Sequence, residues 1–542
     1  MAAALLAAPL FAESGRETIP AGSWAFEALR AIHLDAGRVP PPVVAPMSVS
    51  ELRLYLRAID AATLSPPGLD AFRRLEALAE PSVADEGLSM SLGASAGLEL
   101  RYRGEESIPW LAPSSERPSL VTIPVEFGIG ELARGFIDIE LREGWWVSSL
   151  PSSALGTRNW TNVPDAAEYF DIHIPRRGGV SVGGASWNFT LARDRLDFGA
   201  EELGAVTVSK GLDRVDFALL SAFSSSIGWR TLVAQLESIP VIVDEGTPTE
   251  YETSIQRHLY LHRFDWRPIP GVSIGMTEGV MVAQPLELRY LNPLASFHAL
   301  AAWKYYGDHD SSVGSLLGLD LAWTPFRGAR AWGQLALNQF KTPFPSEAGS
   351  LQPDAYALLG GVSYAMAKGG GFLGFELEGY YAVPWFATLY GREWSFLGMR
   401  HELVAPVGYA WDDEVLTWVG SSYGRDTVVG RFEASWSSPG AWALGLEYRL
   451  AARGENALDA DDRWDGDWWV ENWESEPANA ALRTPSGVPV YESTLSLSGA
   501  WRFDPWDLKA FVAWRHEANS GHVAGASASG LELSASVVRR VF

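Results

Sequence analysis

The residues best suited to chemistry lie at positions 459–476, in the stretch DADDRWDGDWWVENWESE. It holds eight acidic residues, four tryptophans and one arginine, and it lacks the apolar period with which a helix or strand would bury the indole rings. Sugars present apolar C–H faces and hydroxyl edges, so exposed aromatic planes beside carboxylate acceptors can bind them. The candidate glycan-binding residues are Trp464, Trp468, Trp469, Trp473, Asp461, Asp465 and Asp467.

Two other interpretations of this stretch stay open. The tryptophans could instead pack the segment onto its neighbours, while the acids keep it soluble. A cation site is a further alternative, because Asp461, Asp465 and Gly466 fall on positions 1, 5 and 6 of an EF-hand loop. Arg463 and Asn472 occupy positions 3 and 12, where that loop needs ligands, so only a calcium ion (Ca2+) bound in a different geometry fits. No other cofactor is expected.

Catalytic chemistry has weaker support in the sequence. Glu376 and Glu378 share one face of an alternating segment, and two carboxyl groups at a set separation can hydrolyse a glycosidic bond. Same-face neighbours among many other charges are more typical of a pore lining. His298 is expected to be a hydrogen-bonded structural residue. The sequence has no glycine-rich phosphate loop, zinc-ligand spacing or nucleophile elbow, so we expect a protein that is not an enzyme.

The composition narrows the class of protein that could present such a stretch. The 542 residues include no cysteine, which excludes disulfides and suits a chain exported to an oxidising compartment. The formal charge of −24 argues against nucleic acid as a partner, because that binding depends on Lys and Arg neutralising phosphates. Residues 1–12, MAAALLAAPLFA, resemble the apolar part of a signal peptide without its basic region. The alternative is an alanine-rich, frayed terminus.

A helical region is predicted at residues 13–85, on the periplasmic side of a membrane. Apolar residues recur there at helical spacing. The three predicted helices, separated by prolines, cover residues 23–38, 48–64 and 66–80. Ser48 and Glu51 have the spacing of a capping box at the start of the second helix.

Residues 86–542 are predicted to form strands, because the apolar period becomes two and stays so. Segments of about nine to eleven residues, the length that crosses a bilayer when tilted, recur with this alternation, as in FLGFELEGYY at 372–381. Hydrocarbon offers no hydrogen-bond partner to the backbone, so strands can cross it only in a closed barrel. We therefore predict a mainly-β, transmembrane antiparallel β-barrel of more than a dozen strands. A large soluble β-protein is the alternative.

The connections between these segments have two very different lengths. Tight turns are predicted at SSPG (437–440), DPWD (504–507), PIPG (268–271) and KGGG (368–371). Residues 341–354 and 451–490 form long polar connections. Short turns at one rim, long loops at the other and aromatic girdles are typical of outer-membrane barrels. The candidate girdle residues are Trp146, Trp266, Trp323, Trp436 and Trp501. If the last strand ends at the periplasmic rim, loop 451–490 faces the exterior of the cell.

Residues 285–323, PLELRYLNPLASFHALAAWKYYGDHDSSVGSLLGLDLAW, resemble the signature of the capsule-assembly Wzi family. In that family a strand leads into a Tyr-x-Asn-Pro-Leu turn, a short helix, an Asp-bearing segment and a Gly-x-Asp strand. The matching residues are Tyr290, Asn292, Pro293, Leu294, Asp310, Gly318 and Asp320. Residues 191–211 are similar to the family's Arg-containing strand and the turn after it, with Phe198 where tryptophan is usual. Residues 29–56 resemble its periplasmic helices.

This resemblance implies an 18-stranded outer-membrane barrel plugged by periplasmic helices and loops. Such a protein helps to hold exopolysaccharide on the bacterial surface as a lectin, rather than exporting or cleaving it. The implied partners are outer-membrane lipid and extracellular polysaccharide, and the oligomeric state stays open. A porin-like channel for small solutes is the alternative function. The helical region favours the first function if it blocks the lumen.

Overall fold

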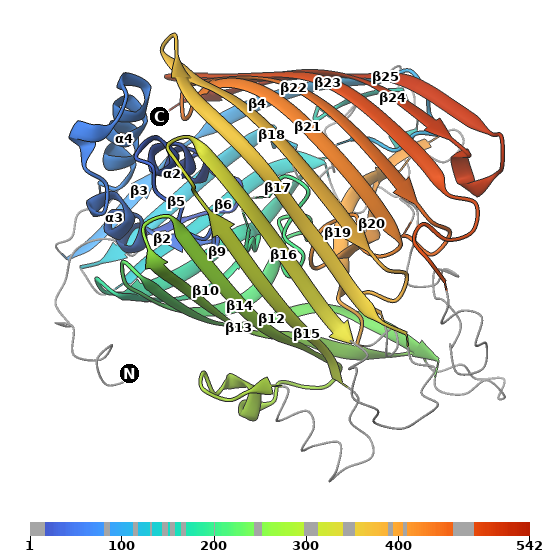
Figure 1. The fold of residues 1–542 in the computed structure, drawn as a ribbon, viewed down its shortest axis with the longest axis horizontal. Coiled ribbons are helices and arrows are strands. Elements are labelled where there is room, and N and C mark those ends of the chain that lie inside the picture. Colours follow the sequence, from blue (N-terminus) through green and yellow to red (C-terminus); the bar gives the residue numbers. More distant parts are fainter. Residues whose placement is uncertain are drawn as a thin grey trace.

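The computed structural model shows a barrel of antiparallel strands with a group of helices at one end (Figure 1). The described residues are 17–80, 87–111, 117–130, 133–143, 150–151, 158–163, 170–199, 201–242, 252–297, 313–339, 353–388, 394–404, 409–458 and 482–541. Among these residues, no helix is both long enough and apolar enough to cross a membrane.

The N-terminal part consists of short helices and one two-stranded sheet. Its elements are β1 (Thr18–Ile19), α2 (Trp24–Asp35), β2 (Met47–Ser48), α3 (Val49–Arg57), η1 (Ala61–Thr63) and α4 (Pro66–Leu78). A serine side chain caps each α-helix by accepting a backbone amide hydrogen. The second helix ends at Arg57 and does not reach residue 64 as predicted. The reason is local, since Asp60 accepts the amide of Ala62 and thereby starts the separate turn η1.

The barrel contains most of the strands. They are β3 (Leu88–Leu92), β4 (Ser95–Arg103), β5 (Val121–Ile129), β6 (Ala133–Glu143), β8 (Asn159–Thr161), β9 (Phe170–Gly183), β10 (Trp187–Asp194), β11 (Val215–Phe223), β12 (Ile227–Ile242), β13 (Glu252–Ile269), β14 (Val272–Val282), β15 (Val313–Trp323), β16 (Ala329–Gln339), β17 (Ala355–Lys368), β18 (Gly371–Ala382), β21 (Thr427–Ser438), β22 (Trp442–Arg453), β23 (Val490–Phe503), β24 (Trp506–Ala518) and β25 (Ser527–Arg540). A separate three-stranded sheet has the order β19 (Leu397–Val404), β20 (Tyr409–Trp418) and β7 (Leu150–Pro151).

The barrel closes because its last strand pairs with one of its first. β25 pairs with β4 from Glu532↔Arg103 to Arg540↔Ser95. β3 and β4 both pair with β5 and share one position in the wall, while the short β8 adds to β4. The wall therefore has 18 strands, as the family resemblance implies.

Alternation places apolar side chains on the outside of the barrel. On β22, Leu446, Tyr448 and Leu450 are 41–48% exposed. Between them, Glu447 faces inward and pairs with Arg431 of β21 at 2.7 Å. This pattern suits a wall with lipid outside and polar groups inside.

All four predicted tight turns connect neighbouring wall strands, and the helices lie at the rim that they form (Figure 1). Arg74 of α4 donates to Ser438 Oγ and Pro439 O, both at 3.0 Å. The amide of Val39 donates to Pro270 O at 2.8 Å.

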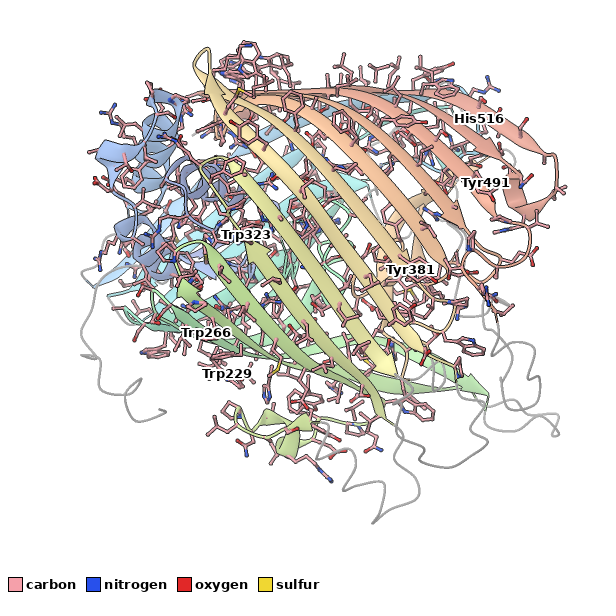
Figure 2. The ribbon with its side chains drawn as sticks, in the orientation of Figure 1. Trp229, Trp266, Trp323, Tyr381, Tyr491 and His516 are labelled. Carbon is pink, nitrogen blue, oxygen red and sulfur yellow. The ribbon has the colours of Figure 1, made fainter. Side chains whose placement is uncertain are left out.

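Exposed tryptophans lie near this short-turn rim, where a girdle is expected. They are Trp266, Trp323, Trp436 and Trp501, which are 40–52% exposed. Figure 2 shows Trp266 and Trp323 near the helices, and Tyr381 and Tyr491 toward the other rim. Trp146, the fifth predicted girdle residue, lies outside the described residues.

Candidate functional site

The lumen contains chain segments as well as wall side chains. The described parts of two segments contribute to one apolar cluster with the wall: residues 195–214, between β10 and β11, and residues 383–426, between β18 and β21. Ser209 joins the two segments, since its amide donates to Val419 O at 2.8 Å and its hydroxyl to Gly420 O at 2.6 Å. Cluster members from the segments and the wall include Phe198, Leu203, Val208, Phe386, Leu397, Trp418, Leu232, Leu261 and Met281. Apolar side chains therefore fill this part of the lumen.

A buried chain of charges connects α3 to the wall. Arg230 of β12 pairs with Glu51 of α3 and, at 2.7 Å, with Asp265 of β13. Asp265 also binds Arg263 at 2.9 Å, and Arg263 binds Asp320 of β15 at 2.9 Å. Each guanidinium lies between two carboxylates, which offsets much of the desolvation cost of burying these charges.

Glu51 forms only part of the predicted capping box. Ser48 Oγ accepts the amide of Glu51 at 3.3 Å, as expected for an N-cap. The Glu51 carboxylate accepts the Tyr55 hydroxyl and pairs with Arg230 instead. Burial, and then the nearby Glu51 charge, raise the pKa of Tyr55 to about 12, so the phenol stays protonated and donates. Glu51, in the first turn of α3, thus holds the helix against the wall.

A second cluster of charges connects α2 to β18, β21 and β22. Four carboxylates surround Arg431, those of Glu376, Glu378, Glu433 and Glu447. Arg30 of α2 reaches Glu376 at 3.3 Å. Glu376 and Glu378, the pair that could hydrolyse a glycoside, thus both lie beside the Arg431 guanidinium, at 3.0 and 3.8 Å.

A cavity of about 60 Å³ lies between α2, residues 40–42 and the wall strands β14–β16. Arg330 lies over the Trp332 ring at 4.3 Å, and its Nη2 donates to Glu201 Oε1 at 3.1 Å. Within the described ranges, Arg330 Nε and Nη1, Trp332 Nε1 and Glu201 Oε2 have no hydrogen-bond partner. The cavity has room for roughly four water molecules, which can both donate and accept.

The fold is similar to that of Wzi from Escherichia coli, an outer membrane protein involved in group 1 capsule assembly and a carbohydrate-binding β-barrel. The TM-score is 0.57, the alignment covers 96% of this chain and 98% of that one, and the sequence identity is 11%. This similarity shows that the two chains share a closed β-barrel fold.

Other solved barrels overlap less well. The outer membrane channel DcaP of Acinetobacter baumannii is 9% identical with a TM-score of 0.33, and covers 84% of this chain and 97% of its own. Pseudomonas aeruginosa OccD3 is 8% identical with a TM-score of 0.42, and covers 86% of this chain and 96% of its own. No protein-family model and no curated protein matches the sequence.

The candidate glycan-binding residues lie outside the described residues, but the two ends of their loop are described. Outside them are Trp464, Trp468, Trp469, Trp473, Asp461, Asp465 and Asp467, together with Asp310 and His298. Asp426 holds both ends of the loop, because it accepts the amide of Asn456 at 3.1 Å and that of Ser486 at 3.0 Å.

The structure separates the other residues that carry the family resemblance. Asp320 faces the lumen and pairs with Arg263. Tyr290, Asn292, Pro293 and Leu294 lie between β14 and β15, and Tyr290 packs on Tyr260, which faces away from the lumen. They therefore do not form one site with Asp320.

Sequence reasoning missed the buried arginines of the wall, above all Arg230, which pairs with Glu51 of α3, and Arg431, which lies among four wall carboxylates. A signal for them was present, because an arginine on the polar phase of a barrel strand must find a counter-charge in the lumen. The partner cannot be read from the strand itself, since Glu51 lies 179 residues before Arg230.

Proposed function

We propose that this chain is a bacterial outer-membrane barrel that binds or anchors extracellular polysaccharide at the cell surface without cleaving it. The observation that carries the proposal is the occupied lumen. A channel for solutes needs a continuous water-lined path, whereas here the described parts of residues 195–214 and 383–426 pack against the wall in an apolar cluster. The Arg230–Glu51 and Arg30–Glu376 ion pairs hold α3 and α2 against the wall at the short-turn end of the same barrel.

The rim opposite the short turns, where the long connections lie, supports a binding role. Asp426 binds the backbone amides of Asn456 and Ser486, which lie in the described segments on either side of residues 459–481. The loop carries the cluster of tryptophans and acids whose chemistry suits sugars. Similarity in fold to a carbohydrate-binding barrel, over nearly the whole of both chains, supports the same function.

Replacing the four tryptophans Trp464, Trp468, Trp469 and Trp473 by alanine tests the proposed site. We expect binding of the cell's own surface polysaccharide to weaken by about tenfold or more, equivalent to ~1.4 kcal/mol. Binding is measured on the purified protein, and retained polysaccharide is measured on intact cells. Trp501→Ala, at the short-turn rim, is the matched control and should bind normally.

Two results would count against the proposal. Full polysaccharide retention by cells that lack the protein would remove the anchoring function. A large, stable conductance of the purified protein in planar bilayers would instead favour the porin-like channel. Normal binding by the four-tryptophan variant would remove loop 459–481 from the site and leave binding to be located elsewhere.

A further inference from the structure

Residues 285–297, here named the outer strap, lie on the outer face of the barrel wall. They follow β14, include the turn η4 (Leu288–Leu291), and appear in Figure 1 as the olive-green segment beneath the wall. The strap packs on outward-facing positions of β13, Tyr260 and His262, which alternate with the lumen residues Leu261 and Arg263. A connection that leaves the rim thus folds back along the outside.

Aromatic rings fasten the strap to the wall. Tyr290 lies 5.0 Å from the Tyr260 ring, and Phe297 stacks on His262 at 3.9 Å, measured between ring centroids. Tyr290 and Phe297 are fully buried. The Tyr260 hydroxyl accepts the amide of Glu287 at 3.0 Å.

The strap covers polar groups on the outer face of the wall. His262 and Glu278 are directly opposite each other in the β13–β14 pairing. Ser296 of the strap donates to the Glu278 carboxylate at 3.1 Å. A polar group that faces hydrocarbon loses its hydration at a cost in free energy. The strap keeps this pair of residues out of contact with hydrocarbon.

The other side of the strap is apolar and exposed. Leu286, Leu288 and Leu294 are 51%, 79% and 76% exposed. Leu294 follows a turn formed by Asn292 and Pro293. In this turn Asn292 Oδ1 accepts the amide hydrogen of Leu294 at 3.1 Å.

The leucines continue an apolar surface of the wall. On β15, which pairs with β14, Leu317, Leu319 and Leu321 are 40–55% exposed. The strap lies on this outer face, so whatever solvates the wall also meets the strap.

We propose that the outer strap is a membrane-contact element, whose leucines enter the boundary between headgroups and acyl chains of the outer leaflet. This rests on the proposed location of the barrel in a membrane. Lipid is favoured over a second copy of the chain because the three leucines extend a lipid-facing surface. Arg289 of the strap pairs with Glu287 at 2.6 Å and keeps a side chain that is 47% exposed, so its charged end meets the polar side of that boundary.

The absence of cysteine allows a direct test by single labelling. Leu288→Cys and Leu294→Cys, each carrying an environment-sensitive fluorophore, are reconstituted into phospholipid vesicles with lipopolysaccharide. We expect blue-shifted emission that is quenched by brominated acyl chains and protected from iodide. Leu319→Cys on the wall is the lipid-facing control, and the exposed Ser107→Cys between β4 and β5 is the aqueous control.

The controls separate failure of this inference from failure of the proposed location. If labels at 288 and 294 behave like the label at 107 while the label at 319 is quenched by lipid, the strap faces water and the inference is wrong. If both labels are protected from both quenchers and the protein sediments as an oligomer, a second copy covers the strap, which also overturns it. Absence of lipid quenching at 319 would contradict the membrane location itself.

Discussion

Arg230 shows how one buried charge can hold two elements together. Its side chain is 1% exposed and lies between Glu51 on α3 and Asp265 on β13. A buried ion pair need not add net stability, but removal of one partner leaves the other charge without compensation. This buried pair therefore ties α3 to the wall, next to the Arg267 guanidinium of β13, which lies 4.8 Å from the Tyr55 ring of α3.

Arg230→Met should strongly destabilise the docking of α3 against the barrel wall. Methionine fills the same space with an apolar side chain but leaves the Glu51 carboxylate buried without its counter-charge. We therefore expect the free energy of unfolding to fall by about 3–5 kcal/mol. Urea unfolding of the purified protein in detergent, followed by tryptophan fluorescence, measures it. Arg158→Met is the control, because the Arg158–Glu106 pair at 3.0 Å is about half exposed and should change stability by roughly 0–1 kcal/mol. Equal effects of the two substitutions would contradict this interpretation.

At the scale of the residue, sequence alone could assign Arg230 to a strand but could not name its partner. Its inward neighbour Leu232 is apolar and belongs to the lumen cluster, so the inner face is not uniformly polar. Whether an inward-facing side chain lies beside a charged group depends on the path that the helices and the lumen segments take through the barrel. That path is set by contacts distant in sequence, not by a local period.

At the scale of the element, Asp35 at the end of α2 connects three parts of the structure. Its Oδ2 accepts both the amide and the hydroxyl of Ser65, the N-cap of α4, at 2.7 Å. Its Oδ1 accepts from Arg327 in the β15–β16 turn. Gly68 allows this approach, because a Cβ at that position would lie 2.1 Å from Asp35 Oδ2.

Asp35→Ala should therefore loosen the helices from the short-turn rim. Loss of the shared acceptor leaves the Ser65 donors unpaired, which costs about 1–3 kcal/mol. Limited proteolysis within residues 17–80 should become faster while the barrel resists the protease. Asp60→Ala removes an exposed acid that caps only η1, and should leave the cleavage rate nearly unchanged. Unchanged cleavage in Asp35→Ala would show that other contacts suffice to dock the helices.

The sequence predicted the helices better than it predicted the strap. Serine caps and helical spacing are local signals, so the starts of α2, α3 and α4 lie within one residue of the predicted ones. The turn at Asn292 and Pro293 was also visible locally. Its position on the outer wall was not, because it depends on rings of β13 that no pattern in residues 285–297 can indicate.

At the scale of the whole molecule, period and turn length were enough to predict the barrel. Alternation along segments such as 372–381 gives each strand one apolar and one polar face. The unequal lengths of the connections distinguish the two rims of the barrel. Filling of the lumen could not be predicted in the same way. Residues 195–214 carry their apolar side chains without a strand or helix period, and their place is fixed only by packing against the wall.

The two faces of one strand provide the last test of this architecture. Leu497 on β23 is 54% exposed on the outer face near mid-strand, and the exposed Ser498 faces the lumen beside Glu433 across Gly445. In lipid vesicles, Leu497→Arg should cost about 2–4 kcal/mol, because an arginine near the bilayer midplane loses its hydration. Ser498→Arg gains a nearby carboxylate and should cost far less, although it adds the same side chain one residue away. The urea concentration at half-unfolding measures both. A larger loss for Ser498→Arg would mean that the apolar face of β23 does not meet hydrocarbon, and that the barrel is not embedded as its alternation predicts.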